Sequence, residues 1–143
     1  MTGSNEAFQT RKDSYLLKVF VYGTLKPGEV NYQRYCTGKV IQAQSAIAPG
    51  QLFDLPAGYP AMTQGLGWVQ GFVLSFEGSG MLAQLDDLED YDVGRPASQN
   101  LYERHYIKIF NPAGHSLGAA WVYLMSLERI RGMAGTRLPK GCW

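Results

Sequence analysis

The segment at residues 16–28, Leu-Leu-Lys-Val-Phe-Val-Tyr-Gly-Thr-Leu-Lys-Pro-Gly, constrains the fold more than any other part of this sequence. Its first seven residues are rich in β-branched and aromatic side chains and too few for an isolated buried helix, so they predict a strand. Gly23 ends this strand, and Pro27-Gly28 is a turn sequence. Because glycine has no Cβ, a ligand can approach the main chain there, and outward N–H groups would hold an anion such as a carboxylate. The alternative, that Gly23 only serves a tight turn, stays open.

Composition favours one β-rich domain. With 143 residues and 45% hydrophobic content, the chain is long enough for one core and too short for two ordinary domains. Its seventeen glycines and seven prolines indicate many turns, and its nine tyrosines and six phenylalanines suit strands. We expect residues 15–143 to form a single domain, preceded by a disordered lead-in at residues 1–14.

Charge and cysteine content argue against several classes of function. The net charge is +1 and the basic residues are not clustered, so no nucleic-acid surface is expected. No apolar stretch approaches the roughly 20 residues of a membrane span, and the polar start does not resemble a secretory signal. Cys36 and Cys142 have no partners at metal-ligand spacing, so we expect two free thiols in a reducing cytoplasm, with a disulfide between them as the alternative.

Turn residues divide the rest of the chain into strands with few helices between them. Gly71 indicates a bulge or a close backbone approach within one strand, and Ser79 is the expected N-cap of the longest helix. Because the strands follow one another in runs, we predict an α+β fold with a mainly antiparallel sheet. The predicted strands are residues 39–47 (ended by Pro49-Gly50), 51–54, 68–76, 102–110 and 117–124, the predicted helices are 30–36 and 81–91, and the tail from 126 is a helical turn followed by coil.

Glu89 is the most informative residue of the predicted helix. Apolar side chains at 81, 82, 85 and 88 form one stripe, and Glu89 falls inside it, four positions after Leu85. Asp86 falls at the edge of the stripe. A carboxylate aimed at a core must be paired, hydrogen-bonded or beside a cavity, and partial burial would raise its pKa toward that of a general acid/base at neutral pH. A structural ion pair with Arg104 or Arg95 is the alternative.

Other catalytic groups have weaker support. His105 and His115 have no companions at ligand spacing, and no serine or cysteine lies in a nucleophile motif. Gly78-Ser-Gly80 is too short for a phosphate-binding loop and lacks its lysine. We therefore expect neither a metal ion nor another cofactor.

Several short motifs, taken together and in order, resemble the gamma-glutamylcyclotransferase-like family, in particular its short branch that includes gamma-glutamylamine cyclotransferase. The most specific are the loop after the first strand and the glutamate in the helix. The resemblance covers residues 17 to 125. The motifs are Val21-Tyr-Gly-Thr-Leu25 with Lys26-Pro-Gly28, Tyr59-Pro-Ala61, Val69-Gln-Gly71, Leu85-Asp-Asp-Leu-Glu-Asp-Tyr91, Tyr102-Glu-Arg104 and Ala120-Trp-Val-Tyr123.

The resemblance implies a β-barrel-like fold with a few helices packed outside and a cavity between the first loop and the glutamate helix. It assigns substrate binding to Tyr22, Gly23, Thr24 and Leu25, with Tyr123 as a less secure substrate contact. It assigns Glu89 as the catalytic acid/base that releases 5-oxoproline from a small γ-glutamyl compound. The glycine that usually follows this glutamate in the family is Asp90 here, which we interpret as a harmless variation, and the insert at residues 92–100 is expected to shape the mouth of the site.

A non-catalytic binding module of the same fold, holding a small ligand or a protein partner, is the second hypothesis. In either case we expect a cytoplasmic protein, monomeric or weakly dimeric, with no nucleic-acid or membrane partner. The aromatic tail that ends at Trp143 is a candidate to cover the cavity or to make a dimer contact.

Overall fold

The computed structural model describes residues 16–143, so the predicted lead-in at residues 1–14 lies outside it. Strands dominate this part of the chain, and the helices are short. In order, the elements are β1 (Leu16–Val21), the π-helical turn η1 (Tyr32–Cys36), β2 (Val40–Asp54), β3 (Pro60–Glu77), α2 (Gly80–Leu88), the 3-10 turn η2 (Ala97–Gln99), β4 (Glu103–Phe110), β5 (Ser116–Leu124), α3 (Leu127–Gly132) and β6 (Thr136–Arg137).

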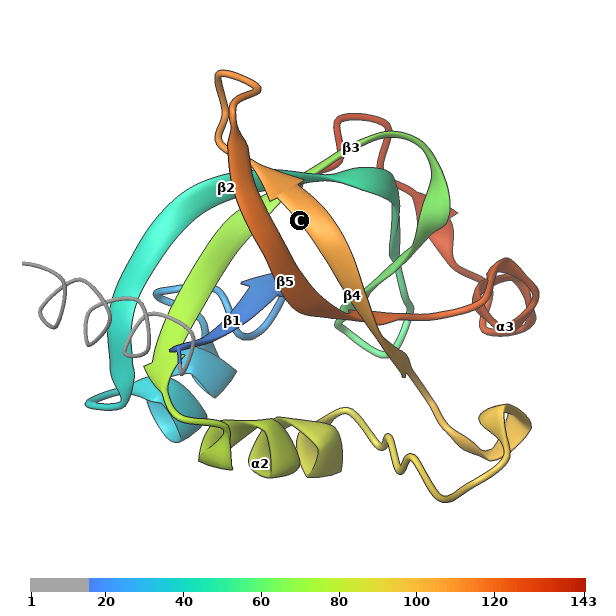
Figure 1. The fold of residues 1–143 in the computed structure, drawn as a ribbon. Coiled ribbons are helices and arrows are strands. Elements are labelled where there is room, and N and C mark those ends of the chain that lie inside the picture. The colour runs from blue at the N-terminus through green and yellow to red at the C-terminus, as the bar shows by residue number, and fades with distance from the viewer. Residues whose placement is uncertain (1–15) are drawn as a thin grey trace, which may run out of the picture.

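The strands form one barrel-like sheet with the order β3-β1-β5-β4-β2-β6 (Figure 1). A further pairing of β2 with β3 closes β3, β1, β5, β4 and β2 into a ring, and β6 pairs with β2 beside it. All strand pairs are antiparallel except β1 and β5, which meet in parallel where Val19 pairs with Trp121. The predicted α+β fold with a mainly antiparallel, barrel-like sheet is confirmed. Two of the strand pairings consist of a single residue pair. These are the β1–β5 pairing and the pairing of Ile47 in β2 with Phe110 in β4.

β1 is buried on both of its faces. Leu17, Val19 and Val21 belong to one buried apolar cluster, which also contains Met81 and Leu85 of α2. Phe20 and the following Tyr22 point the other way, into a second cluster formed largely by the inner faces of β2–β5. Side chains alternate along a strand, so a continuous apolar run is what such a doubly covered position requires.

β2 and β3 are longer than predicted. The sequence placed a strand end at Pro49-Gly50, but β2 continues through it with a shift of register between Pro49 and Gln51. A bulge accommodates the proline, whose missing N–H would otherwise break the ladder, so the strand bends and does not end. β3 likewise begins at Pro60, eight residues before the predicted start.

Gly71 lies in β3 at a close backbone approach and not at a bulge. It pairs in register with Ala46 of β2, and a Cβ built on it would lie 2.2 Å from the carbonyl oxygen of Val21. This resolves the two alternatives that the sequence left open at this position. Only glycine fits between the two neighbouring strands here.

α2 lies below the strands in the view of Figure 1, and the chain leaves it through an extended loop toward β4. It ends at Leu88, three residues before the predicted end. Ser79 occupies the predicted N-cap position, but its side chain makes no capping hydrogen bond. The predicted short helix before residue 36 is a single π-helical turn, η1.

The tail is more ordered than predicted. After α3, β6 pairs with the end of β2, and Gly141 accepts a hydrogen bond from the Gln70 N–H (2.7 Å). Trp143 packs against the second cluster and donates from Nε1 to Asp54 Oδ1 (3.0 Å). Lys26 donates to the carbonyl oxygen of Trp143 and lies over its ring. Trp143 therefore connects the loop after β1 with the end of β2, and it is not among the residues that line the cavity described below.

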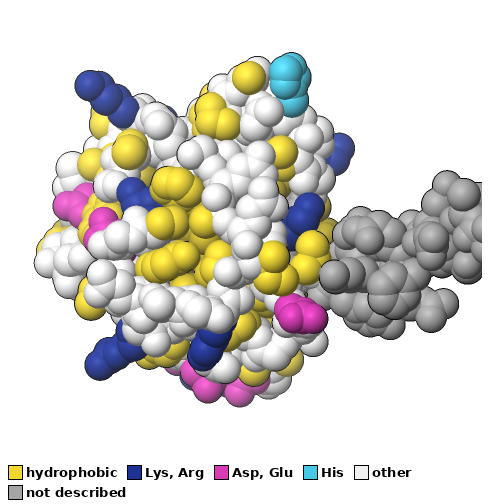
Figure 2. Space-filling model, turned by 90° about the vertical axis from the view of Figure 1, so that its left-hand side faces the viewer, with side chains coloured by type: hydrophobic (Ala, Val, Ile, Leu, Met, Phe, Trp, Pro, Cys, Tyr) yellow, Lys and Arg dark blue, Asp and Glu magenta, His cyan; other side chains and the backbone are white. Residues whose placement is uncertain are grey.

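The two cysteines are unpaired, Cys36 buried and Cys142 exposed, so the disulfide alternative is wrong. Within residues 16–143, no helix has the length and apolar character needed to cross a membrane. On the face shown in Figure 2, hydrophobic atoms gather in a central hollow, and lysine and arginine side chains are scattered around it.

Candidate active site

A cavity of about 310 Å³ opens where β1 runs into the following loop. Five parts of the chain meet there: this loop, the corner between β2 and β3, the C-terminal end of α2, the approach to β4 and the end of β5. Glu89 is the one carboxylate among the lining residues, and none of them is a lysine or arginine. The lining residues are Phe20, Val21, Tyr22, Gly23, Thr24, Leu25, Asn31, Gly58, Tyr59, Pro60, Leu88, Glu89, Leu101, Tyr102 and Tyr123.

Glu89 is the residue directly after α2, and its backbone N–H still bonds to the carbonyl oxygen of Leu85 (2.9 Å). Its side chain is partly buried in the cavity wall. Among residues 16–143, no side chain or backbone group donates a hydrogen bond to its carboxylate. Burial without a partner raises the pKa of Glu89 to about 7, because water solvates the ionised form poorly there.

The two arginines proposed as alternative partners of Glu89 pair with other carboxylates. Arg104 bonds to Asp86 Oδ2 (2.5 Å), and Arg95 bonds to Asp90 Oδ1 (3.1 Å). The structural ion-pair interpretation of Glu89 is therefore wrong. An acid that faces a hollow without a salt bridge is free to exchange its proton with a bound molecule.

The loop after β1 turns at Gly23, whose carbonyl oxygen accepts from Lys26 N–H (3.0 Å). A Cβ on Gly23 would lie 2.5 Å from Pro60 Cγ, so the packing of Pro60 excludes any larger residue. Thr24 anchors the loop: its carbonyl oxygen accepts from Asn31 and Tyr32 N–H, and its Oγ1 accepts from Asn31 Nδ2 (2.8 Å).

The backbone N–H groups of Gly23, Thr24 and Leu25 take no part in these bonds. None of them donates a hydrogen bond to another group within the described part of the chain. Three unpaired donors at the edge of a cavity form the type of concavity that binds an anion or a developing oxyanion.

Four tyrosines line the cavity, and three of them, Tyr22, Tyr102 and Tyr123, donate their hydroxyl proton to a group other than Glu89. Tyr22 donates to the carbonyl oxygen of Tyr123 (2.5 Å), and Tyr102 donates to that of Pro60 (2.8 Å). Tyr123 donates to Asp86 Oδ1 (2.7 Å). Burial raises the pKa of all three phenols, and the negative charge of Glu89 adds to the effect, so each stays neutral at physiological pH.

The cavity brings together all six residues named from the sequence: Glu89, Tyr22, Gly23, Thr24, Leu25 and Tyr123. It also includes Tyr59 and Tyr102, which were not predicted as site residues. The signal that could have identified them is their place in the motifs Tyr59-Pro-Ala61 and Tyr102-Glu-Arg104. His105 and His115 are exposed and absent from the lining.

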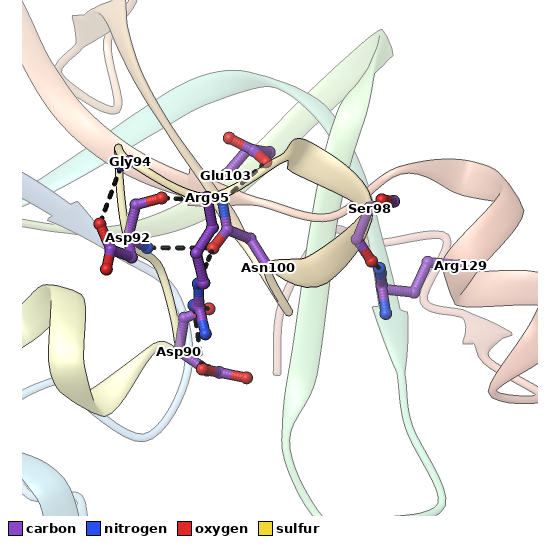
Figure 3. A network of polar contacts seen from close by, with 8 residues as sticks. All are labelled: Asp90, Asp92, Gly94, Arg95, Ser98, Asn100, Glu103 and Arg129. Atoms are coloured by element: carbon purple, nitrogen blue, oxygen red, sulfur yellow. Dashed lines mark hydrogen bonds and ion pairs between the residues drawn. The ribbon is translucent and has the colours of Figure 1, made fainter.

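The insert at residues 92–100 is held by a polar network around Asn100, which is 3% exposed (Figure 3). Asn100 Oδ1 accepts from Asp92 N–H (3.0 Å) and from Arg95 Nε (2.9 Å), and its Nδ2 donates to Glu103 Oε1 (3.2 Å). Leu101, which lines the cavity, follows Asn100 directly and donates from N–H to the carbonyl oxygen of Asp90. The network thus holds one wall of the cavity through the backbone.

No three His, Cys, Asp or Glu side chains among residues 16–143 come together as a set that could hold a metal ion. The polar groups that face the cavity are one carboxylate, phenols, an amide, a hydroxyl and backbone N–H groups. These groups can bind an ammonium, a carboxylate and an amide, and can move a proton.

Sequence comparison places this geometry in a known family. The family description "Gamma-glutamyl cyclotransferase, AIG2-like" matches residues 19–143. The chain belongs to this family. A relative from Niallia circulans, gamma-L-glutamyl-butirosin B gamma-glutamyl cyclotransferase, is 32% identical over 111 residues, which is 76% of this chain and 68% of the relative. The family description and the relative's name support gamma-glutamyl cyclotransferase activity in general.

Solved structures with the same fold include YkqA of Bacillus subtilis, with a TM-score of 0.61 and 23% identity over 90% of this chain. The chain spans 39% of the length of YkqA. An AIG2-like protein of Mus musculus gives a TM-score of 0.54 with 23% identity over 78% of both chains. At this identity the likeness shows the fold alone.

Proposed function

We propose that this protein is a gamma-glutamyl cyclotransferase that releases 5-oxoproline from a small γ-glutamyl compound, with Glu89 as the general acid/base. The observation that supports this most is the unpaired, partly buried carboxylate of Glu89 at the wall of the cavity. Its pKa near 7 means that it can accept and return a proton at neutral pH.

The proposed reaction needs no nucleophile from the protein. The α-amine of the substrate attacks its own γ-carbonyl carbon, forming a ring C–N bond, and the bond from that carbon to the leaving nitrogen breaks. Glu89 takes one proton from the α-ammonium group before attack and gives it to the leaving nitrogen. The ring nitrogen loses a second proton after attack, and the released amine takes it up as an ammonium group, so atoms and charge balance without water. The cavity holds the γ-glutamyl chain folded, a positioning effect that can contribute several kcal/mol.

We assign the free N–H groups at Gly23–Leu25 to the substrate's negative oxygen atoms. They suit the α-carboxylate in the ground state or the oxyanion at the γ-carbon during attack, and both assignments stay open. The phenol oxygens of Tyr22, Tyr102 and Tyr123 still have lone pairs after donating, so they suit an ammonium group.

The test is a panel of γ-glutamyl amino acids, γ-glutamyl-ε-lysine and γ-glutamyl amines, assayed for 5-oxoproline. Glu89→Gln keeps the shape of the side chain and removes the proton carrier, so turnover is expected to fall by about 10² or more. Asp87→Asn is the matched control, because Asp87 is an exposed neighbour in α2 and no part of the cavity.

Activity of the Glu89→Gln protein equal to that of the parent protein would contradict the catalytic assignment. Saturable binding across the panel without release of 5-oxoproline by the unaltered protein would indicate a binding module. In that case Glu89 would still contact the ligand, and Glu89→Gln would weaken ligand binding.

A further inference from the structure

A chain of three groups connects the cavity to a covered ion pair. Tyr123 lines the cavity and donates its hydroxyl proton to Asp86 Oδ1 (2.7 Å), while Asp86 Oδ2 accepts from Arg104 Nη1 (2.5 Å). The side chains of Asp86 and Arg104 are 19% and 16% exposed. Both oxygens of the Asp86 carboxylate are thus occupied, one by the phenol and one by the guanidinium.

The fold holds this chain of groups from three directions. Arg104 and Tyr123 are direct cross-strand partners in the β4–β5 ladder, so their side chains leave the sheet on the same face. Asp86 approaches from α2, three residues before Glu89 and therefore one turn away on a neighbouring face of the helix. The guanidinium is stacked over the rings of Trp121 (4.7 Å) and Tyr91 (5.2 Å).

A tyrosine beside a carboxylate normally donates to it. Glu89 and Tyr123 line the same cavity, and the negative charge of Glu89 contributes to the raised pKa of Tyr123. Such a bond would stabilise the ionised form of Glu89 and make it a weaker base. The second carboxylate, Asp86, accepts this proton instead, and its ion pair with Arg104 holds Asp86 in place.

We infer that Asp86, held by Arg104, is a positioning residue that keeps the hydroxyl proton of Tyr123 turned away from Glu89. Glu89 then receives no hydrogen bond from residues 16–143, and the Tyr123 oxygen presents lone pairs to the cavity. The inference rests on the proposed role of Glu89 in the reaction. It assigns a function to Asp86 and Arg104, neither of which lines the cavity.

The other groups around Glu89 do not replace this arrangement. Tyr22 and Tyr102 line the same cavity, but their protons are bound to backbone carbonyl oxygens, which do not titrate. Tyr59 lines it from the corner between β2 and β3, and no other carboxylate and no lysine or arginine is among the lining residues. Tyr123 is the phenol whose proton depends on an ionisable partner.

The experiment is a pH titration of the Glu89 carboxyl carbon by NMR in the full chain labelled with ¹³C-glutamate, with Glu89→Gln identifying the signal. In Asp86→Asn the Tyr123 hydroxyl loses its anionic acceptor and turns to Glu89, so the midpoint is expected to fall by about one pH unit. In Asp86→Asn/Tyr123→Phe at least half of that fall is expected to disappear. A fall that persists in the double variant would assign the effect to the unpaired charge of Arg104 and overturn the inference, as would an unchanged midpoint in Asp86→Asn.

Tyr123→Phe alone keeps the inference testable if Asp86→Asn does not fold. Because the hydroxyl proton points away from Glu89, the Glu89 midpoint is expected to stay within about 0.3 pH unit of the parent value. A clear rise would show that Tyr123 donates to Glu89 and would overturn the inference. The titration needs no turnover, so it separates this inference from the proposed function, whose failure appears in the 5-oxoproline assay.

Discussion

A single residue, Glu89, makes the stability of the folded protein depend on pH. Its pKa rises from an ordinary value of 4.5 to about 7 on folding, because the cavity wall removes water from the carboxylate. The folded state therefore binds a proton more tightly than the unfolded state. The contribution of Glu89 to stability is intact below pH 4.5 and is lost as the pH rises through 7.

We therefore expect Glu89→Gln to stabilise the protein at pH 8 by about 1–2 kcal/mol, an amount reduced for the partial exposure of the side chain. At pH 4.5 the two proteins are expected to have the same free energy of unfolding, since the glutamate is then largely neutral when folded. Urea denaturation at both pH values measures the difference. A difference in the free energy of unfolding that is the same at both pH values would contradict a pKa of about 7 for Glu89 in the folded protein.

Asp90 occupies a backbone conformation that favours glycine. Its φ is 51°, in the left-handed region, where an aspartate is tolerated better than most L-residues. Its side chain is 60% exposed and pairs with Arg95. A glycine would adopt this conformation without strain, whereas Asp90 adopts it at some cost.

Two substitutions separate these contributions. Asp90→Gly loses an exposed ion pair and relieves the backbone, so the free energy of unfolding is expected to stay within about 0.5 kcal/mol of the parent value. Asp90→Ala loses the pair without that relief and is expected to cost about 1 kcal/mol or more. Thermal or urea unfolding measures both, and equal stabilities of the two variants would contradict the backbone argument.

At the scale of the elements, β1 is fixed between β3 and β5, and Gly71 sets how closely β3 approaches it. The Val21 oxygen lies where a Cβ of residue 71 would stand, and Val21 leads directly into the loop that lines the cavity. The close approach of β3 therefore affects both the packing of the sheet and the position of the loop that lines the cavity.

Gly71→Ala is expected to lower the free energy of unfolding by about 3 kcal/mol or more, because the clash is with backbone that cannot rotate aside. Gly80→Ala at the start of α2 is the control, since a Cβ there meets nothing within 4 Å. Its effect is expected to stay within about 0.5 kcal/mol. If both variants unfold at the same denaturant concentration, the close packing of β1 and β3 is not what the distances imply.

At the scale of the molecule, the segment after α3 connects parts that are far apart in the sequence. β6 pairs with the end of β2, and Gly141 bonds to β3. Trp143 contacts Asp54 and also Lys26, which follows the cavity loop. The first loop, the end of β2 and the tail are thereby held together.

Trp143→Ala is expected to lower the free energy of unfolding by about 1–2 kcal/mol, through lost apolar contact and the lost bond to Asp54. Leu66→Ala, at a side chain that is 88% exposed, is the control and is expected to change little. Hydrogen exchange at Gln70, whose N–H bonds to Gly141, reports whether the tail has been released. Unaltered protection and stability would show that the tail does not brace the sheet.

Local pattern alone identified the first strand, the strands β4 and β5, most of α2 and the inward position of Glu89. Each depends on periodicity or turn residues within about a dozen positions, so no distant contact is needed to recognise it. The likeness of the loop and the helix to a known family added the cavity residues. The local pattern and the family likeness together predicted that Glu89 lies beside a cavity with Tyr22 and Tyr123.

Only the tertiary structure decided which partners the charged groups take. From the sequence, Glu89 could have formed an ion pair with Arg104 or Arg95. In the structure, the β4–β5 register and the position of α2 bring Arg104 to Asp86 instead. The continuation of β2 through Pro49-Gly50, the parallel contact of β1 with β5 and the docking of Trp143 likewise depend on segments far apart in sequence. Such pairings are fixed by packing across the whole sheet, because a side chain has no local signal for a partner that only folding brings near it.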